Sequence, residues 1–356
     1  MISKEREGKY LGKTVQVVPH ITDEIQDWIE RVAHVPVDGT ESVPDVCVIE
    51  LGGTVGDIES MPFIEALRQF QFRVGTDNFC LIHVSLVPVV GAVGEQKTKP
   101  TQHSIQALRS AGLSPHMLAC RSKHPLEQSV MDKLALFCHV DPKCIINLCD
   151  VSNIWHVPLV MLEQDALRNI MKQLQIPYQA PDLERWAYRA TKWDNVTTPV
   201  TIALVGKYTG LGDSYLSVTK ALLHSSIACD RKLDLLWIEA SDLEEETKQE
   251  DAEKYEAAWA SIKKAQGVLV PGGFGGRGTE GKMIAAKFAR ENKVPYLGIC
   301  LGMQCMVIEY ARHVLNLADA HSTEMEPETK NPAVIFMPEG SKTHMGGTMR
   351  LGSRRT

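Results

Sequence analysis

Short apolar runs rich in β-branched residues alternate with amphipathic helical patterns along most of the sequence. In the first half we interpret five such runs as buried strands, at 15–18, 46–51, 80–86, 117–120 and 144–148. Apolar strands of this kind are typical of sheets that are covered on both faces. Helical stripes separate the runs, and Thr22 is expected to cap the first of these helices. The alternation predicts right-handed βαβ crossovers and an α/β fold with mostly parallel sheets.

The alternation is interrupted between Gln175 and Pro199, where prolines and polar residues predict a linker. Strands are expected again at 201–205, 233–238, 267–270 and 296–299. The length of 356 residues is typical of two domains. We therefore predict two doubly wound domains, at 1–174 and 200–356, joined by the linker 175–199.

The composition argues against several classes of protein. The 38 Lys and Arg residues against 44 Asp and Glu give a formal charge of −6, which is unlike a protein that binds nucleic acid in bulk. Nine cysteines without a C-x-x-C pair argue against a zinc ribbon and a disulfide framework. Polar residues interrupt the longest apolar stretch, 79–94, and the N-terminus has no signal-peptide core. We expect a reduced cytoplasmic protein, with no nucleic acid and no membrane as partner.

The most informative stretch is 295–304, where an apolar strand ends at Cys300 and a helical pattern starts at once. Gly298 and Gly302 stand two residues before and after the cysteine, which is the spacing of a nucleophile elbow. A helix that begins at a cysteine stabilises the thiolate, the nucleophilic form. The alternative is a buried cysteine at a strand end, as most cysteines are, but the two glycines favour the nucleophile.

The loop 270–278, with the sequence Val-Pro-Gly-Gly-Phe-Gly-Gly-Arg-Gly, follows another apolar strand. Its backbone N–H groups are suited to stabilise an oxyanion that forms when a nucleophile attacks a carbonyl. Gly273, Gly275 and Gly278 also match G-x-G-x-x-G, a pattern of dinucleotide sites. Because the loop follows a late strand and starts with Pro271, an oxyanion turn is the favoured interpretation.

Two stretches of the first half carry residue types that bind nucleotides. In 50–59, glycines accompany Glu50, a hard oxygen ligand suited to Mg²⁺, and further carboxylates that accept hydrogen bonds from a base or sugar. In 94–102, lysines and threonines surround a proline and form a plausible cradle for a triphosphate. The alternatives are an acidic turn and an exposed basic loop, neither with a ligand.

Pro271–Gly275 followed by Gly298–Gln304 resembles a class I glutamine amidotransferase. Several further stretches resemble the CTP synthase family: 10–22, 50–59, 96–102, 137–140, 203–208 and 346–352. The likeness therefore covers nearly the whole chain. The resemblance implies a P-loop-NTPase-like synthetase domain and a flavodoxin-like amidotransferase domain. It implies ATP-dependent amination of UTP to CTP with ammonia from L-glutamine, with Mg²⁺ accompanying ATP and no organic prosthetic group. CTP as feedback inhibitor, GTP as activator, a homotetramer and filaments are also implied.

The resemblance assigns roles to individual residues. Cys300 would attack the glutamine amide, and the N–H groups of Gly273 and Leu301 would form the oxyanion hole. The residues that would contact glutamine are Gly273, Leu301, Gly302, Met303, Gln304 and Glu324. The residues that would contact UTP or CTP are Asp57, Ile58, Glu59, Lys97, Thr98, Lys99, Pro100, Thr101, Gln102 and Lys133. Glu50 would bind Mg²⁺, and the residues beside the ATP adenine would be Cys149, Asp150 and Val151.

The sequence departs from the family pattern in two respects. It contains no G-x-x-x-x-G-K-[ST] loop for the ATP phosphates, and no His-x-Glu pair follows Cys300. We therefore expect both domains to be incomplete, and little glutamine hydrolysis by this chain. The alternative function is a catalytically inactive subunit that assembles with full-length CTP synthase and modulates it. A longer open reading frame in the gene would favour the enzyme. A confirmed short transcript would favour the inactive subunit that modulates the full-length enzyme.

Overall fold

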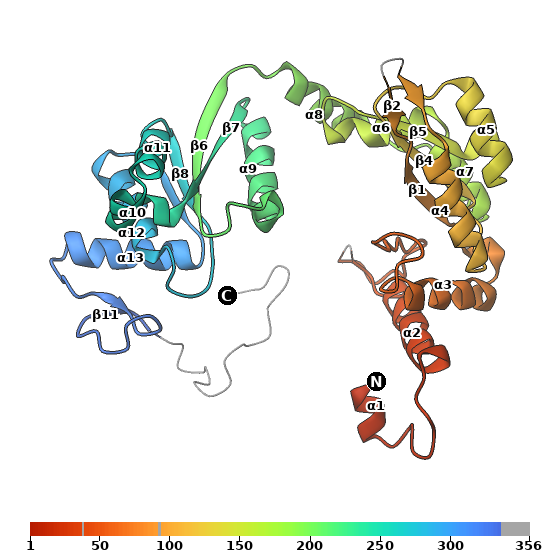
Figure 1. Cartoon of the computed structure of the whole chain (residues 1–356), viewed down its shortest axis with the longest axis horizontal. Coiled ribbons are helices and arrows are strands. Elements are labelled where there is room, and N and C mark those ends of the chain that lie inside the picture. The colour runs from red at the N-terminus through yellow and green to blue at the C-terminus, as the bar shows by residue number, and fades with distance from the viewer. Residues whose placement is uncertain (38, 92–93, 336–356) are drawn as a thin grey trace. The chain divides into compact units, whose positions relative to one another are not determined.

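The structure, a computed structural model, describes residues 1–37, 39–91 and 94–335. The chain divides into two compact units, Met1–Asp194 and Asn195–Thr356 (Figure 1). Each unit is built around its own parallel sheet with helices packed against it. Within the described ranges, no helix is long and apolar enough to cross a membrane.

The main sheet of the first unit has three parallel strands in the order β1-β4-β5. These strands are β1 (Ile82–Leu86), β4 (Met117–Ser122) and β5 (Ile145–Cys149). On one face, Leu118 and Cys120 pack against α4 (Lys99–Ser110) and α5 (Gln128–Cys138). On the other, Met117 and Ile146 pack against α6 (Val157–Glu163) and α7 (Ala166–Gln173). The strands predicted at 80–86, 117–120 and 144–148 are thereby confirmed. The predicted burial is not borne out for β1, in which Val84 is 70% and Leu86 58% exposed.

Helices and short elements complete the first unit. They are α1 (Ile2–Arg6), a π-helical turn η1 (Val17–Ile21), α2 (Thr22–Ala33), α3 (Met61–Val74), η2 (Thr76–Asn78), η3 (Pro142–Cys144), η4 (Ile154–His156) and the antiparallel pair β2 (Val89–Val90) and β3 (Glu95–Gln96). Prolines stand in the first turns of α3 and α4, where the missing N–H leaves no helical bond unmade. Helices α2 and α3 pack together through a cluster that includes Ile29, Ile64 and Leu67.

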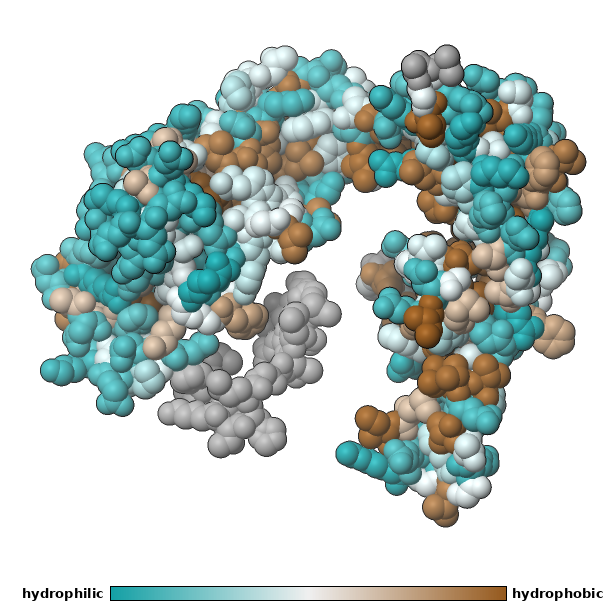
Figure 2. Space-filling view, in the orientation of Figure 1, coloured by the Kyte–Doolittle hydropathy of each residue, from teal (hydrophilic) through white to brown (hydrophobic). Residues whose placement is uncertain are grey.

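Two of the predicted buried strands are wrong. Residues 15–18 lead into the π-helical turn, and 46–51 form neither helix nor strand. Their apolar side chains lie at the surface, with Val48 89% exposed. Figure 2 shows brown, apolar side chains at several places on the surface of the first unit. Apolar composition favours burial, but a strand also needs a neighbour to pair with, and neither segment pairs with another described strand. The cap is also wrong, because the Thr22 hydroxyl donates to the carbonyl of Pro19 and Ile21 occupies the N-cap position.

The segment predicted as a linker contains the helix α8 (Glu184–Asn195). This helix packs on the first unit: the indole N–H of Trp186 donates to the carbonyl of Trp155 at 2.5 Å. Asp194, near its end, accepts hydrogen bonds from Ser152 at 2.9 Å and from Asn153 at 2.8 Å. The structural division at Asp194 therefore falls inside the predicted linker, at the end of a helix that belongs to the first unit.

The second unit has a four-stranded parallel sheet in the order β7-β6-β8-β9. Its strands are β6 (Pro199–Gly206), β7 (Lys232–Glu239), β8 (Gly267–Val270) and β9 (Tyr296–Gly298). Its helices are η5 (Gly212–Tyr215), α9 (Leu216–Ala228), η6 (Ala240–Leu243), α10 (Glu245–Glu250), α11 (Ala252–Ile262), α12 (Thr279–Glu291) and α13 (Leu301–His313). Beyond them lie the paired short strands β10 (His321–Ser322) and β11 (Pro332–Val334). The strands predicted at 201–205, 233–238, 267–270 and 296–299 are confirmed.

Helices cover both faces of this second sheet. Ala203, Val205 and Val268 pack with α11 and α12 on one face. Leu204 and Leu269, which point the opposite way along the same strands, pack with Tyr215 and α9 on the other. The alternation along each strand divides the apolar side chains between two cores, as expected for a doubly wound sheet.

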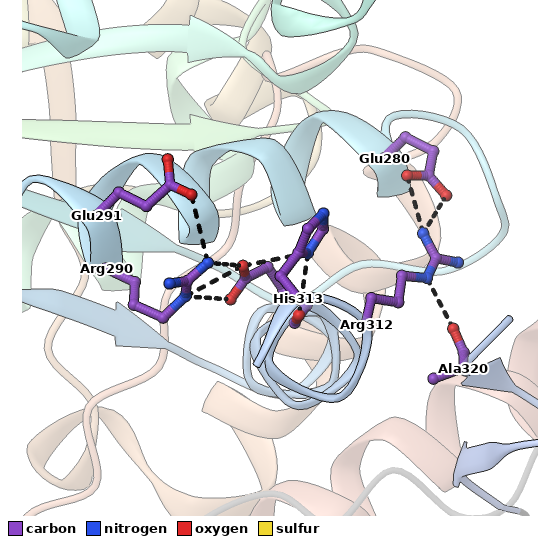
Figure 3. A network of polar contacts seen from close by, with 7 residues as sticks. Glu280, Arg290, Glu291, Arg312, His313 and Ala320 are labelled. Atoms are coloured by element: carbon purple, nitrogen blue, oxygen red, sulfur yellow. Dashed lines mark hydrogen bonds and ion pairs between the residues drawn. The ribbon is translucent and has the colours of Figure 1, made fainter. Parts of the chain in front are cut away.

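Helices α12 and α13 are joined by ion pairs (Figure 3). The carboxylate of Glu309, with a side chain only 2% exposed, accepts bidentate hydrogen bonds from Arg290 at 2.7–3.2 Å. His313 lies 3.3 Å from the same carboxylate, and Arg312 binds Glu280 at 3.0 Å. Because Glu309 is buried, its charge depends on Arg290 for compensation.

Replacing Arg290 by methionine should lower the free energy of unfolding by clearly more than the loss of an exposed pair, because the Glu309 carboxylate would stay buried without its main partner. The double variant Arg290→Met with Glu309→Leu should recover most of this loss, since an apolar pair needs no compensation. Urea unfolding would measure both. Lys254→Met is the control: its pair with Asp251 is exposed and should contribute at most about 1 kcal/mol. Equal losses of unfolding free energy in Arg290→Met and Lys254→Met would contradict this account.

Candidate functional site

The carboxyl ends of three strands in the second unit meet at one edge of the sheet. Lys207 follows β6, the glycine loop (Pro271–Gly278) follows β8, and Cys300 follows β9. In this sheet β6 comes first in the sequence, β7 lies on one side of it, and β8 and β9 lie on the other side. Ligands of open α/β sheets bind at the carboxyl edge where the strand order reverses, and here that point lies between β6 and β8.

Cys300 lies in a strained turn between β9 and α13. Its backbone has φ 51° and ψ −110°, a conformation that costs free energy for any residue with a side chain, and its side chain is exposed. The flanking glycines have no room for a side chain. A Cβ on Gly302 would lie 2.0 Å from the carbonyl oxygen of Val270, and one on Gly298 would lie 2.6 Å from the backbone of Gly302. The structure therefore confirms the predicted strand-to-helix elbow and its need for both glycines.

The glycine loop passes directly beside this elbow. A Cβ on Gly272 would lie 3.3 Å from the Cβ of Cys300 and 3.8 Å from its sulfur. A Cβ on Gly273 would lie 3.8 Å from the side chain of Leu301. The two residues predicted to donate N–H groups to an oxyanion are thus close together, next to the cysteine. This packing favours the oxyanion turn over a dinucleotide site.

Two buried lysines lie under the glycine loop. The ammonium group of Lys207 donates to the carbonyl oxygen of Phe274 at 2.7 Å and to that of Gly275. The ammonium group of Lys282 donates to the carbonyl of Pro271 at 3.2 Å. Burial lowers the pKa of both lysines, that of Lys282 to about 8. Backbone carbonyls are therefore the acceptors that hold these cations in place.

The other residues predicted to contact glutamine lie along α13 and just beyond it. Met303 and Gln304 belong to the first turn of α13, where the N–H of Gln304 donates to the carbonyl of Cys300 at 3.1 Å. Glu324 is exposed in the turn after β10, and β10 lies against α13. The motif 346–352 lies outside the described residues. Among the described residues no histidine is hydrogen-bonded to Cys300.

In the first unit, the residues predicted to bind a triphosphate lie at the carboxyl edge of the main sheet. The nucleotide loop (Lys97–Gln102) follows β3 and runs into the first turn of α4. Thr101 is fully buried, and its hydroxyl is hydrogen-bonded to Ser85 of β1 at 2.8 Å. The loop is therefore fixed to the end of a strand, with a helix N-terminus and its unpaired N–H groups at the same place.

The lysines of this edge gather around one carboxylate. Lys97 forms an ion pair with Glu95 at 2.6 Å. Lys97 and Lys133 both lower the pKa of Glu95, Lys97 the more strongly, which places Lys133 of α5 near the nucleotide loop. Two cations that lie far apart in the sequence thus act on the same carboxylate.

The remaining residues of the predicted nucleotide site lie in an exposed turn and at the end of β5, where Cys149 and Val151 are half-buried. Asp57, Ile58 and Glu59 belong to a turn before α3, in which the Ser60 hydroxyl donates to the Thr54 carbonyl at 3.1 Å. Cys149 ends β5, and the N–H of Asp150 donates to the carbonyl of Ser122, which ends β4. Residues 149–151 therefore share the carboxyl edge with the nucleotide loop.

Glu50 is an exposed carboxylate, and no group of three or more His, Cys, Asp or Glu side chains in the described part of the chain could hold a metal ion. One carboxylate fits the way in which proteins bind Mg²⁺ together with a nucleotide, because waters and phosphate oxygens fill the other positions. Glu50 therefore has the chemistry of such a ligand, although it does not form a metal site by itself.

Two family models match the sequence: CTP synthase N-terminus over residues 1–176, and glutamine amidotransferase class-I over residues 211–356. The whole chain is 59% identical over 368 residues to CTP synthase of Eremothecium gossypii, 64% of which is covered. It is 55% identical over 359 residues to CTP synthase 1 of Homo sapiens, 61% of which is covered. The chain belongs to the CTP synthase family.

The two parts of this CTP synthase-family chain coincide with the two structural units, since the first match lies within Met1–Asp194 and the second within Asn195–Thr356. The chain spans less than two thirds of the curated CTP synthases named above, 64% and 61%. A solved structure, the Trypanosoma brucei CTPS glutaminase domain with bound acivicin, is 39% identical and matches 40% of this chain and 53% of that one. Its TM-score of 0.36 is too low to support the fold by itself.

Sequence patterns did not single out the two buried lysines that lie under the glycine loop. Lys207 appeared only within the motif 203–208, and Lys282 in no motif. A lysine that directly follows an apolar strand is a usable signal, because it places a cation at the carboxyl edge. Lys282 lies in a helix, and only the folded chain shows that it points under the glycine loop.

Gly302→Ala should lower the free energy of unfolding of the second unit by about 1–3 kcal/mol. The added methyl group would lie 2.0 Å from the Val270 carbonyl oxygen and would force α13 away from β8. Thermal unfolding would measure the loss. Gly276→Ala is the matched control in the same unit, since a Cβ there meets no atom within 4 Å. If the two variants melted at the same temperature, the close packing of α13 on β8 would be refuted.

Proposed function

We propose that this chain is part of a glutamine-hydrolysing CTP synthase, a ligase that aminates UTP to CTP with ATP and with ammonia from glutamine. The observation that carries the proposal is the strained, exposed Cys300, which lies between β9 and α13 beside the glycine loop. A buried structural cysteine needs no positive φ and no pair of crowded glycines. The nucleotide loop of the first unit supports the synthetase half of the reaction.

In the glutaminase half, the sulfur of Cys300 attacks the γ-carbonyl carbon of glutamine. The C–N bond breaks, ammonia leaves, and water hydrolyses the remaining γ-glutamyl thioester. The N–H groups of Gly273 and Leu301 stabilise the oxyanion of each tetrahedral intermediate. Gly302, Met303 and Gln304 line the first turn of α13 beside the substrate. Glu324 supplies a carboxylate for the substrate's α-ammonium group.

In the synthetase half, the lysines and hydroxyls of the nucleotide loop, with Lys133, bind the triphosphate of UTP, or of CTP as inhibitor. Asp57, Ile58 and Glu59 contact the nucleotide, and the residues that lie beside the adenine of ATP are Cys149, Asp150 and Val151. Glu50 would hold Mg²⁺, which neutralises charge on the phosphates when it is bound. A cytoplasmic homotetramer, filaments and activation by GTP complete the proposal, and these rest on the family resemblance alone.

A glutamine-like electrophile, such as a diazoketone analogue, should label Cys300 selectively. Cys300 is exposed, whereas burial raises the pKa of Cys305, one turn further along α13, to about 11 and keeps it as an unreactive thiol. Peptide mapping by mass spectrometry would locate the label. Cys300→Ser should abolish labelling, and Cys305→Ser should leave it unchanged.

Excess glutamine should slow this labelling, since the analogue and the substrate share the site. A label on another cysteine, or labelling that glutamine does not slow, would contradict the nucleophile assignment.

Lys97→Ala should weaken the binding of UTP or CTP about 10–100-fold, because one charge-assisted phosphate contact contributes about 1.5–3 kcal/mol. Lys143→Ala is the control, since Lys143 stands just before β5, at the opposite edge of the sheet. Isothermal titration calorimetry would measure both. Unchanged affinity in Lys97→Ala, or an equal loss in Lys143→Ala, would show that the nucleotide loop does not bind the phosphates.

A further inference from the structure

We propose that Lys207 is a positioning residue of the glutaminase site, whose ammonium group holds the carbonyls of Phe274 and Gly275 and so fixes the glycine loop beside Cys300. This inference rests on the proposed function, because it is the oxyanion role of the loop that makes its position matter. Lys207 itself does not touch the substrate in this proposal. It acts through the backbone of the loop.

The ammonium group of Lys207 donates its hydrogen bonds to the glycine loop. The residue is 2% exposed, and its Nζ donates to the Phe274 carbonyl at 2.7 Å and to the Gly275 carbonyl. Its Cδ lies 3.1 Å from the place that a Cβ on Gly273 would occupy. The side chain therefore passes directly under Gly273, the proposed oxyanion donor, and its end holds the next two residues of the loop.

Lys207 is itself held at its backbone. Its N–H donates to the hydroxyl of Tyr215 at 2.9 Å, and its carbonyl accepts a hydrogen bond from Arg277, at the far end of the loop. Arg277 forms an ion pair with Glu239, the last residue of β7, at 2.6 Å. The loop is thus tied to the ends of β6 and β7 on one side, while its other side faces Cys300.

Stability alone does not explain a cation at this place. Burial lowers the pKa of Lys207, which shows that the site disfavours the charge. An apolar side chain of similar size in a buried position is often as stabilising as a compensated charge, or more so. The loop, however, contains four glycines within Gly272–Gly276 and has little conformational preference of its own. The buried ammonium group of Lys207, which donates to two carbonyls of the loop, supplies the order that the loop sequence lacks.

The test compares two reactions of Cys300 in Lys207→Met. In the first, the sulfur attacks the γ-carbonyl of γ-glutamyl p-nitroanilide: a thioester bond forms, the C–N bond breaks, and p-nitroaniline leaves with a proton from water. This reaction passes through an oxyanion. In the second, iodoacetamide alkylates the same sulfur by displacement of iodide, without an oxyanion. Acylation should slow by about 10–100-fold, somewhat less than the loss of an oxyanion donor itself, and alkylation should stay within about 2-fold of the parent.

Amide hydrogen exchange gives a readout that does not depend on activity. In Lys207→Met, exchange at residues 272–276 should become faster, while the rest of the second unit keeps the protection of the parent. Lys282→Met is the matched control, because it removes an equally buried ammonium whose hydrogen bond goes to Pro271 at the base of the loop. Its exchange at 274–276 should remain closer to the parent.

Each outcome decides between the proposals. Unchanged loop exchange in Lys207→Met overturns the positioning role. Equally fast exchange at 274–276 in the two lysine variants overturns it too, and so does an equal slowing of acylation and alkylation in Lys207→Met. If Cys300→Ser released p-nitroaniline as fast as the parent chain while Lys207→Met still loosened the loop, the holding of the loop would stand and the proposed role of Cys300 in the glutaminase function would fail.

Discussion

The close packing of α13 on the end of β8 is the constraint on which the second unit depends. The helix begins so near the Val270 carbonyl that Gly302 has no room for even one further carbon atom. Because the helix starts there, the chain between β9 and α13 must turn within two residues. The backbone of Cys300 therefore adopts a strained conformation with φ 51°. The same packing brings the glycine loop after β8 beside the cysteine. The elbow, the loop and the exposed sulfur are therefore consequences of one helix position.

Buried charges then hold this arrangement in place. Glu309 is compensated by Arg290 across α12 and α13, and the ammonium groups of Lys207 and Lys282 are compensated by carbonyls of the glycine loop. Such groups are expensive to bury singly, so each one fixes the geometry of its partner. In the first unit the charged residues of the nucleotide loop lie nearer the surface, and Lys97 is 42% exposed in its ion pair with Glu95. A phosphate can compete for such a lysine, since water already screens the pair.

The comparison of expectation and structure separates two kinds of inference from sequence. Strands such as 117–120 and 201–205 were predictable, because an apolar run between helical stripes has few other ways to be buried in an α/β sheet. The elbow was predictable for a different reason: the spacing of Gly298, Cys300 and Gly302 reflects a local steric requirement. Residues 46–51 carry the same apolar signal as the true strands, yet they remain unpaired and exposed among the described residues. Pairing is a property of two segments, and the sequence of one segment cannot supply it.

The amino-acid sequence by itself determined the parallel α/β architecture, the position of the division between the units to within the segment 175–199, and Cys300 as the candidate nucleophile. These follow from periodicity and from steric rules that act over a few residues. Only the tertiary structure decided that Gly273 and Leu301 meet beside the cysteine, that Lys133 approaches the nucleotide loop, and that Lys207 points under the loop after a different strand. These contacts join residues from separate strands and helices, and they depend on the order in which the sheet is assembled. No pattern within one segment records that order.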